Sequence, residues 1–438
     1  MPMSLRILAL ILSATTASTK LSWRYGAFID AGSEGSRIYI LRWQPADTNR
    51  QIIAPESLGE LSTVPGIASF AQNPGEAGLS LKSLVEYMKQ ELKHEQANWA
   101  QTPLYLRATA GMRLLFPDQR EDILDDIRSY FWTSPFLFRD DMASVATGEE
   151  EGVFGWISAN YLMGNLAPDR KPASNTTVGS LDLGGASAQI VFMPKKSIIQ
   201  HAFPLKLGPH RFELYSFSFL HFGVREAAHS TAGKVISDAL EMVQSETEVY
   251  HPCFAKGYIY TPRFSYSTAR FPAIKVKMQG TGNFPQCEKL IMRIFNKDAP
   301  CLVTQCSFYG VYQPRLYEAK FLAFAHFADI ASDLGLPETT ELEDFRAATQ
   351  YVCSLTIEVL NSLFSRVEDE YDRVHLCFHA TFAYVLLSFG YGMEERNNIV
   401  FKTSHAGKPI DWAVGAMIYE INQDIRLSIP LTNVSVAS

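Results

Sequence analysis

The sequence predicts an α/β protein built from two related lobes, and three observations support this prediction. The chain has 438 residues, which is enough for two or three domains with large hydrophobic cores. Apolar residues make up 47% of the chain and charged residues 19%, so we expect it to be compact throughout. A unit of strand, Asp-x-Gly loop and strand occurs twice, about one domain length apart. Such duplication indicates two lobes that face one another.

The first unit begins with the strand-like run Tyr25 to Ile29 and ends with the run Ile38 to Trp43. Between them lies the loop Asp30-Ala31-Gly32-Ser33-Glu34-Gly35-Ser36-Arg37. Glycines let the backbone approach a phosphate closely and aim N–H groups at it, while serine hydroxyls add donors. A glycine-rich hairpin tip with an aspartate is also a common turn without function, so this loop alone is ambiguous.

The second unit has the same order of strand, loop and strand. This repetition makes it less plausible that the first loop is only a common turn without function. Val178 to Leu181 lead into Asp182-Leu183-Gly184-Gly185-Ala186-Ser187-Ala188-Gln189, and Ile190 to Phe192 follow. An aspartate at each strand end can hold a hydrated divalent cation, which neutralises a polyphosphate. The two loops together therefore predict a phosphate site with a metal ion.

Two segments between the loops carry further candidate residues. Thr109 follows the predicted strand Pro103 to Leu106, where it is either a polar group at a strand end or an ordinary helix N-cap. Glu149, Glu150 and Glu151 lie where a helix should begin. Acids are favoured in a first helical turn whatever their function, but one of the three is a candidate catalytic base.

The charge and the N-terminus restrict partners and location. With 39 basic and 46 acidic residues the formal charge is −7, so we expect no overall basic surface for nucleic acid. Arg6, the apolar run Ile7 to Leu12 and small residues up to Ser18 predict a signal peptide over residues 1–18, the alternative being a buried strand. We see no second anchor toward the C-terminus and expect a mature chain without a membrane span.

The cysteines fit the same compartment. All six lie between Cys253 and Cys377, which favours disulfides in an oxidising compartment, although the sequence alone leaves their pairing open. Zinc is the alternative, and the lack of a CxxC pair argues against it. Two sequons, at Asn175 and Asn433, agree with a glycoprotein of the secretory pathway.

Taken in order, these residues resemble the apyrases, or nucleoside triphosphate diphosphohydrolases, a family that includes ecto-enzymes and Golgi nucleoside diphosphatases. The resemblance covers nearly the whole mature chain. It rests on ordered motifs at Asp30 to Arg37, Ala108 to Arg113, Gly148 to Asn160, Leu181 to Phe192, and Cys377 to Gly392 with Trp412-Ala413-Val414-Gly415.

The resemblance implies two actin-like, ribonuclease H-like lobes with the active site in the cleft between them. Lobe I is expected over residues 24–147 plus 403–430, because in the family the chain returns to the first lobe at its end through a last helix, here Trp412 to Asn422. Lobe II is expected over residues 148–402. The oligomeric state stays open.

The resemblance also implies a role for individual residues. Glu151, directly before a glycine, would be the general base that activates water, and Thr109 would lie near the attacked phosphorus. Asp30 and Asp182 would hold Ca²⁺ or Mg²⁺, Asp182 through water, with Gln189 and Trp412 in the water network. The residues expected at the phosphates are Gly32, Ser33, Gly35, Ser36, Arg37, Gly184, Gly185, Ala186 and Ser187.

The implied activity is metal-dependent hydrolysis of the terminal phosphate of nucleoside tri- or diphosphates such as ATP, in a protein that is secreted or lies in the Golgi or ER lumen. The implied disulfides are Cys253–Cys287, Cys301–Cys306 and Cys353–Cys377. A sugar kinase or exopolyphosphatase with the same fold would not need Glu151 beside Gly152. An inert nucleotide-binding protein would not need the intact acidic residues, and a structural protein would gain nothing from glycine-rich loops.

Two departures from the family pattern stand out. Ala188 replaces a threonine found in many members, which leaves Ser187 and Gln189 in place. Leu376 stands where several ecto-enzymes have an aromatic residue before the cysteine, so stacking of that residue on a nucleotide base is in doubt. Aromatic rings near Phe324, Phe327 and Tyr391 are candidates for that contact, but such spacing is more typical of a core. The sequence leaves base specificity and the choice between tri- and diphosphates open.

Overall fold

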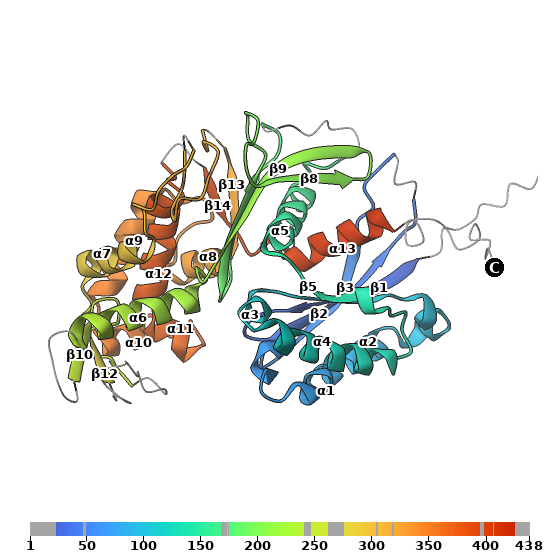
Figure 1. The fold of residues 1–438 in the computed structure, drawn as a ribbon, viewed down its shortest axis with the longest axis horizontal. Coiled ribbons are helices and arrows are strands. Elements are labelled where there is room, and N and C mark those ends of the chain that lie inside the picture. The colour runs from blue at the N-terminus through green and yellow to red at the C-terminus, as the bar shows by residue number, and fades with distance from the viewer. Residues whose placement is uncertain are drawn as a thin grey trace, which may run out of the picture.

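The structure is a computed structural model that describes residues 23–46, 50–167, 173, 175–240, 247–261, 276–303, 305–317, 319–394, 398–405 and 407–424. The predicted signal peptide and the sequon at Asn433 lie outside these residues, while Asn175 is exposed. Two large sheets, each with its own helices, form two lobes side by side (Figure 1). In the described ranges, every helix is too short or too polar to cross a membrane.

The first sheet has the strand order β3-β2-β1-β4-β5. β1, β2 and β3 are antiparallel, whereas β4 and β5 run parallel to β1. The middle of β1, Ala27 to Ile29, is fully buried because helices cover both faces of the sheet. The strands are β1 Arg24–Ala31, β2 Ser36–Trp43, β3 Glu56–Thr63, β4 Leu104–Ala108 and β5 Ala143–Val145, and the helices beside them are α1 Ala77–Ser80, α2 Lys82–Glu91, α3 Ala110–Arg113 and α4 Pro117–Trp132.

The second sheet has the strand order β14-β13-β6-β7-β9-β8. β6, β7 and β9 are antiparallel neighbours, and β13 and β14 run parallel to β6. Apart from β8, the order and directions are those of the first sheet, which confirms the prediction of two related lobes. The strands are β6 Gly179–Leu183, β7 Ser187–Phe192, β8 Ala202–Leu207, β9 His210–Leu220, β13 Phe321–Ala325 and β14 Ile399–Phe401.

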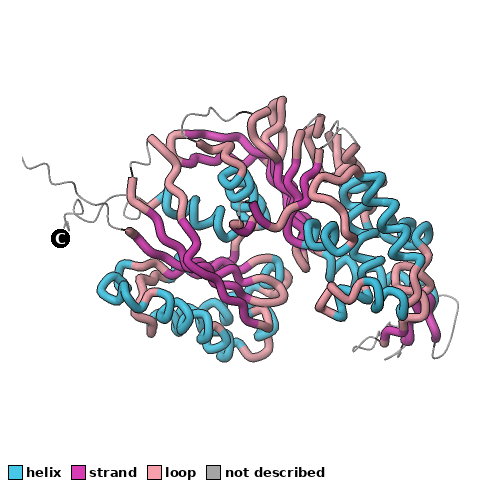
Figure 2. Tube along the Cα trace, turned by 180° about the vertical axis from the view of Figure 1, so that it is seen from behind, coloured by secondary structure: helices cyan, strands magenta, loops and turns pink. Residues whose placement is uncertain are grey.

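Two helices, α5 Gly148–Leu162 and α13 Trp412–Gln423, lie between the sheets and pack against each other, as seen from both sides (Figures 1 and 2). Their crossing is close, because a Cβ added at Gly415 would lie 1.8 Å from the carbonyl oxygen of Phe154. Both helices contribute to the hydrophobic cluster that contains β1. A short hairpin, β15 Ser404–His405 and β16 Lys408–Pro409, precedes α13.

The remaining elements lie beside the second sheet, on the side away from α5 and α13 (Figure 1). The structure joins Cys253 to Cys287, Cys301 to Cys306 and Cys353 to Cys377, the pairs implied by the resemblance, and leaves no described cysteine free. The last of these bridges connects α9 to α12. The elements are α6 Val224–Leu240, β10 Thr247–His251, β11 Ile259–Tyr260, β12 Val276–Gly280, α7 Phe284–Ile294, α8 His326–Asp333, α9 Leu342–Ser354, α10 Ile357–Leu363, α11 Glu370–Val374 and α12 Leu376–Val385.

Candidate active site

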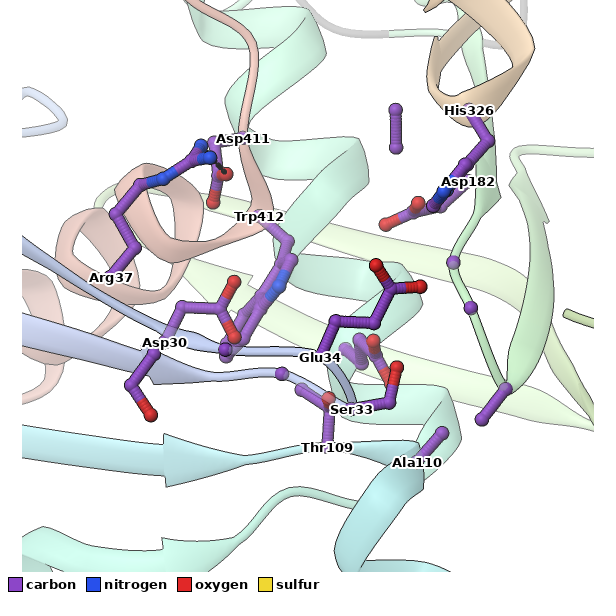
Figure 3. A pocket seen from close by; sticks show the side chains of 18 of the residues that line it. Asp30, Ser33, Glu34, Arg37, Thr109, Ala110, Asp182, His326, Asp411 and Trp412 are labelled. Carbon is purple, nitrogen blue, oxygen red and sulfur yellow. Dashed lines mark ion pairs between the residues drawn. The ribbon is translucent and has the colours of Figure 1, made fainter. Parts of the chain in front are cut away.

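A cavity of about 510 Å³ lies where the two glycine-rich loops approach each other (Figure 3). Its wall contains every site residue expected from the sequence except Gln189. These are Asp30, Gly32, Ser33, Gly35, Ser36, Arg37, Thr109, Glu151, Asp182, Gly184, Gly185, Ala186, Ser187 and Trp412.

The two loops have matching geometry. Asp30 lies opposite Arg37 in the β1–β2 hairpin, and Asp182 lies opposite Gln189 in the β6–β7 hairpin. β4 runs parallel to β1 and ends at Ala108, so Thr109 follows at the same sheet edge as Asp30, directly before α3. Parallel strands place their carboxyl ends at one edge, which explains why residues far apart in sequence meet here.

The loops touch each other across the cavity. A Cβ added at Gly185 would lie 2.7 Å from Glu34 Oε1 and 2.7 Å from Ser33 Oγ. Real Cβ atoms do not approach other heavy atoms this closely. Glycine therefore fits at position 185 as the structure stands, whereas any other residue would require the Glu34 and Ser33 side chains to move. Side chains of the first loop thus reach the backbone of the second loop.

The start of α5 separates the three glutamates by role. Thr147 Oγ1 accepts a hydrogen bond from the Glu150 N–H at 3.1 Å, and Glu150 Oε2 accepts one from the Thr147 N–H at 2.9 Å. Glu150 therefore closes a capping box at the helix start. Glu151 is only 7% exposed and lines the cavity, whereas Glu149 does not.

Glu151 is held by two side chains from different elements. Arg113 of α3 donates to Glu151 Oε2 at 2.7 Å, and the buried amide of Gln189 donates to the same oxygen at 3.2 Å. Both donors also reach Ser187 Oγ, Arg113 at 3.2 Å and Gln189 at 2.8 Å. Gln189 thus lies behind the cavity wall and orients two groups that face the cavity.

The carboxylates of the site raise one another's pKa. Burial raises the pKa of Asp30 and Asp182 well above the usual value, and the charges of Glu151 and Asp411 add to both effects. Burial also raises the pKa of Glu151, which the Arg113 guanidinium opposes. Several buried acids that repel each other are an arrangement that a cation would stabilise.

The donor set fits a hard, hydrated divalent cation. Asp30 Oδ1 and Gln189 Oε1 are buried and have no hydrogen-bond partner among the described residues. Ca²⁺ and Mg²⁺ prefer such carboxylate and amide oxygens together with water. In the described part of the chain, no group of three or more acidic, histidine or cysteine side chains is placed so that it could hold an ion.

Several polar residues of the site were not assigned from the sequence, among them Arg113 and Asp411. Arg113 ends the motif Ala108 to Arg113, and Asp411 directly precedes Trp412. Asp411 caps α13 by accepting from the Ala413 N–H at 2.7 Å, and its other oxygen accepts from the Tyr39 hydroxyl at 2.6 Å. The signal that could have found Asp411 is its position at a helix start. Figure 3 shows Asp411 near Arg37. Arg37 Nη1 and Asp411 Oδ2 are 3.9 Å apart.

The aromatic candidates separate into wall and core. Phe324 and Trp412 line the cavity, and Trp412 packs edge-on against Phe28 with ring centroids 5.6 Å apart. Phe327, Leu376 and Tyr391 are buried in the core of the second lobe and do not line this cavity. The cavity wall thus presents few aromatic faces.

Comparison with known proteins identifies the family and the fold. Residues 16–434 match the GDA1/CD39 (nucleoside phosphatase) family. The chain belongs to this family. As a family member it is a hydrolase that acts on phosphoanhydrides.

Relatives span most of this GDA1/CD39 protein. Probable apyrase 3 of Arabidopsis thaliana is 31% identical over 423 residues, which cover 94% of this chain and 86% of that protein. Ectonucleoside triphosphate diphosphohydrolase 3 of Mus musculus is 31% identical over 443 residues, or 94% and 81% of the two chains. The crystal structure of nucleoside triphosphate hydrolases from Neospora caninum superposes with a TM-score of 0.68 at 17% identity, covering 93% of this chain and 94% of that one. It has the same fold.

Proposed function

We propose that this protein removes the terminal phosphate of nucleoside triphosphates, diphosphates or both, in a reaction that depends on a divalent cation and uses Glu151 as the general base. The observation that carries the proposal is the position of Glu151. Its carboxylate is buried beside two facing glycine-rich loops and is oriented by Arg113 and Gln189. The apyrases and triphosphate diphosphohydrolases among the relatives support nucleotides as the substrates.

In the proposed reaction, Glu151 takes a proton from a water molecule while the water oxygen attacks the terminal phosphorus. The new bond joins that oxygen to phosphorus, and the bond from phosphorus to the bridging oxygen breaks. Inorganic phosphate and a nucleotide shorter by one phosphate leave. Ser187 and Gln189 would position the water, and no covalent phosphoenzyme forms.

The loops would stabilise the phosphoryl group during transfer. Backbone N–H groups around Gly32, Gly35, Gly184 and Gly185 and the hydroxyl groups of Ser33, Ser36 and Ser187 supply the donors, with Thr109 near the reacting phosphorus. Arg37 lines the same cavity. A bound Ca²⁺ or Mg²⁺ would neutralise charge on the polyphosphate. Asp30 would hold it, Asp182 would hold it through water, and Trp412 would lie beside the water network.

The proposed location is the secretory pathway, either outside the cell or in the Golgi or ER lumen. Three disulfides support it, because such bonds persist in oxidising compartments. The similarity to an ectonucleoside triphosphate diphosphohydrolase points the same way.

The direct test is phosphate release from ATP, ADP, GDP and UDP, each with Mg²⁺, with Ca²⁺ and with EDTA. The proposal expects release with at least one metal, a product one phosphate shorter, and little release in EDTA. Release that is equal with and without chelator would contradict the metal requirement. Transfer of phosphate to a sugar in place of water would favour a kinase of the same fold.

Metal binding can also be measured without turnover. A cation that binds only the folded protein raises its stability, by about 2.7 kcal/mol at a concentration 100-fold above Kd. We expect Mg²⁺ or Ca²⁺ to raise the Tm of the wild type, and to raise that of Asp182→Asn much less. Asp238→Asn, at a partly buried aspartate on α6 outside the cavity, is the control and should respond like the wild type. An undiminished response in Asp182→Asn would remove Asp182 from the metal site.

A further inference from the structure

An ion pair joins the two lobes at the glycine-rich loops. Glu34 lies in the first loop, between β1 and β2, and Arg225 is the second residue of α6, which follows the second sheet's β9. The Arg225 guanidinium donates through Nε to Glu34 Oε1. Figure 3 shows Glu34 among the cavity-lining side chains of the first loop.

Arg225 is fixed to the second lobe by two further contacts. Its backbone N–H donates to the Gly185 carbonyl oxygen at 3.0 Å, so the start of α6 is tied directly to the second loop. Its guanidinium lies over the Tyr371 ring of α11, 4.5 Å from the centroid. The end of Arg225 that meets Glu34 is therefore held in place by the second lobe.

Glu34 contacts Arg225, and it also lies against the second loop. Its Oε1 would lie 2.7 Å from a Cβ at Gly185, so the carboxylate rests against the second loop's backbone. The two side chains keep part of their surface in solvent, 40% for Glu34 and 31% for Arg225. Half-exposed ion pairs are weak, so this contact can open at low cost.

We propose that the Glu34–Arg225 pair is a latch between the lobes, which positions the two loops across the cavity and has to open when a nucleotide enters. The identity of the entering molecule rests on the proposed function, whereas the latch rests on the contacts alone. A polyphosphate between the loops brings negative charge next to Glu34, which weakens the pair. Glu34 is thus a positioning residue and not part of the chemistry.

The first experiment measures the separation of the lobes. Spin labels on noncanonical amino acids at the exposed positions Gln90 in α2 and Lys289 in α7 report the distance, since the described cysteines are all in disulfides. In protein without nucleotide, Glu34→Gln should shift the distribution toward longer and more varied distances. The charge exchange Glu34→Arg with Arg225→Glu should restore the narrow distribution.

A matched control comes from the first sheet. Glu56 forms an exposed ion pair with Arg42 at 3.0 Å, and both residues lie within the same sheet. Glu56→Gln removes a comparable charge and a comparable ion pair, but one that lies within the first sheet. It should leave the distances unchanged. Wild-type distances in Glu34→Gln would overturn the latch.

The second experiment measures access to the cavity. The association rate of a fluorescent, non-hydrolysable ATP analogue, followed by stopped flow, should rise about two- to fivefold in Glu34→Gln, the range expected from loss of an exposed ion pair. It should stay unchanged in Glu56→Gln. An unchanged rate in Glu34→Gln would overturn control of access. If the analogue bound neither protein, the proposed function would fail, while the distance measurement would still decide the latch.

Discussion

Arg113 links three parts of the site through one guanidinium group. Its Nη1 donates to the Ala146 carbonyl oxygen at 3.0 Å, and its Nη2 donates to Glu151 and to Ser187. The side chains of Arg113 and Glu151 are only 12% and 9% exposed. A buried charge without its partner costs about 3–5 kcal/mol, so the pair is important for stability as well as orientation.

We expect Arg113→Lys to lower kcat by about 100-fold, the cost typical of a misplaced catalytic group, with a smaller effect on nucleotide affinity. Lysine keeps the charge but lacks the planar fork that contacts several acceptors at once. Steady-state kinetics and calorimetric binding measure the two effects. Arg128→Lys is the control, because Arg128 pairs with Glu121 and Asp125 on α4, outside the cavity wall. A wild-type kcat in Arg113→Lys would show that the function of Glu151 does not depend on the planar guanidinium group of Arg113.

At the scale of single residues, the sequence predicted those cavity residues that lie in short, recognisable motifs. Asp30, Asp182 and the loop glycines could be found because each lies in a short recognisable loop. The connections of Arg113 and Asp411 could not, since they depend on distant chain segments. Tyr39 and Asp411, for example, are 372 positions apart and meet only when α13 packs against the first lobe.

The crossing of α5 and α13 is the element-scale contact on which the site depends. α5 carries Glu151. α13 begins at Trp412, directly after Asp411. Gly415 lets the helices meet at the Phe154 carbonyl, and a Cβ at Gly152 would lie 2.7 Å from Val191 Cγ2 of β7. Small residues thus set how closely α5 approaches α13 and the second sheet.

Gly415→Ala should lower the free energy of unfolding by about 1–3 kcal/mol or more, because the neighbouring atom is backbone and cannot move freely. Activity should fall with it, since the helices shift apart. Gly233→Ala in α6 is the matched control. No atom lies within 4 Å of the added Cβ there, so alanine should stabilise the helix by about 0.5–1 kcal/mol. Urea unfolding measures both variants, and equal stabilities would contradict the tight crossing.

Element prediction from sequence worked where the signal was local. The strand expected at Pro103 to Leu106 is β4, Leu104–Ala108. The last helix, which the family resemblance implied, extends one residue past the expected Asn422. The sheet order was not accessible in the same way. β6 pairs with β13 across more than a hundred residues, and only the packed fold brings these strands together.

At the scale of the whole molecule, buried histidines make stability depend on pH. His251, His375 and His379 are each at most 2% exposed. Burial lowers the pKa of His251 to about 3 and that of His375 to about 4, and places the pKa of His379 well below its usual range. In the unfolded chain a histidine titrates near pH ~6.5. Below that pH the unfolded chain binds protons that the folded protein does not, so stability falls as the pH falls from about 6.5 toward 4.

Replacing one of these histidines should reduce that loss. Between pH 7 and pH 5, each buried neutral histidine lowers the free energy of unfolding by about 2 kcal/mol. His379→Phe should therefore lose about 2 kcal/mol less than the wild type over this interval, measured by urea unfolding at both pH values. Buried acids with raised pKa values have the opposite sign, which is why the comparison is made with the variant. His379→Gln serves if phenylalanine packs poorly, and an unchanged loss in both variants would contradict the role of the buried histidines.

Glu151→Gln tests most directly whether Glu151 activates the attacking water, on which the proposed reaction depends. The amide keeps the shape of the side chain but cannot accept the proton from water. Single-turnover phosphate release with saturating metal and nucleotide should fall by about 10²–10⁴-fold, while Kd for the nucleotide stays nearly unchanged. Glu149→Gln, in the same helical turn but outside the cavity wall, should hydrolyse like the wild type. Turnover near the wild-type rate in Glu151→Gln would contradict the assignment of the base.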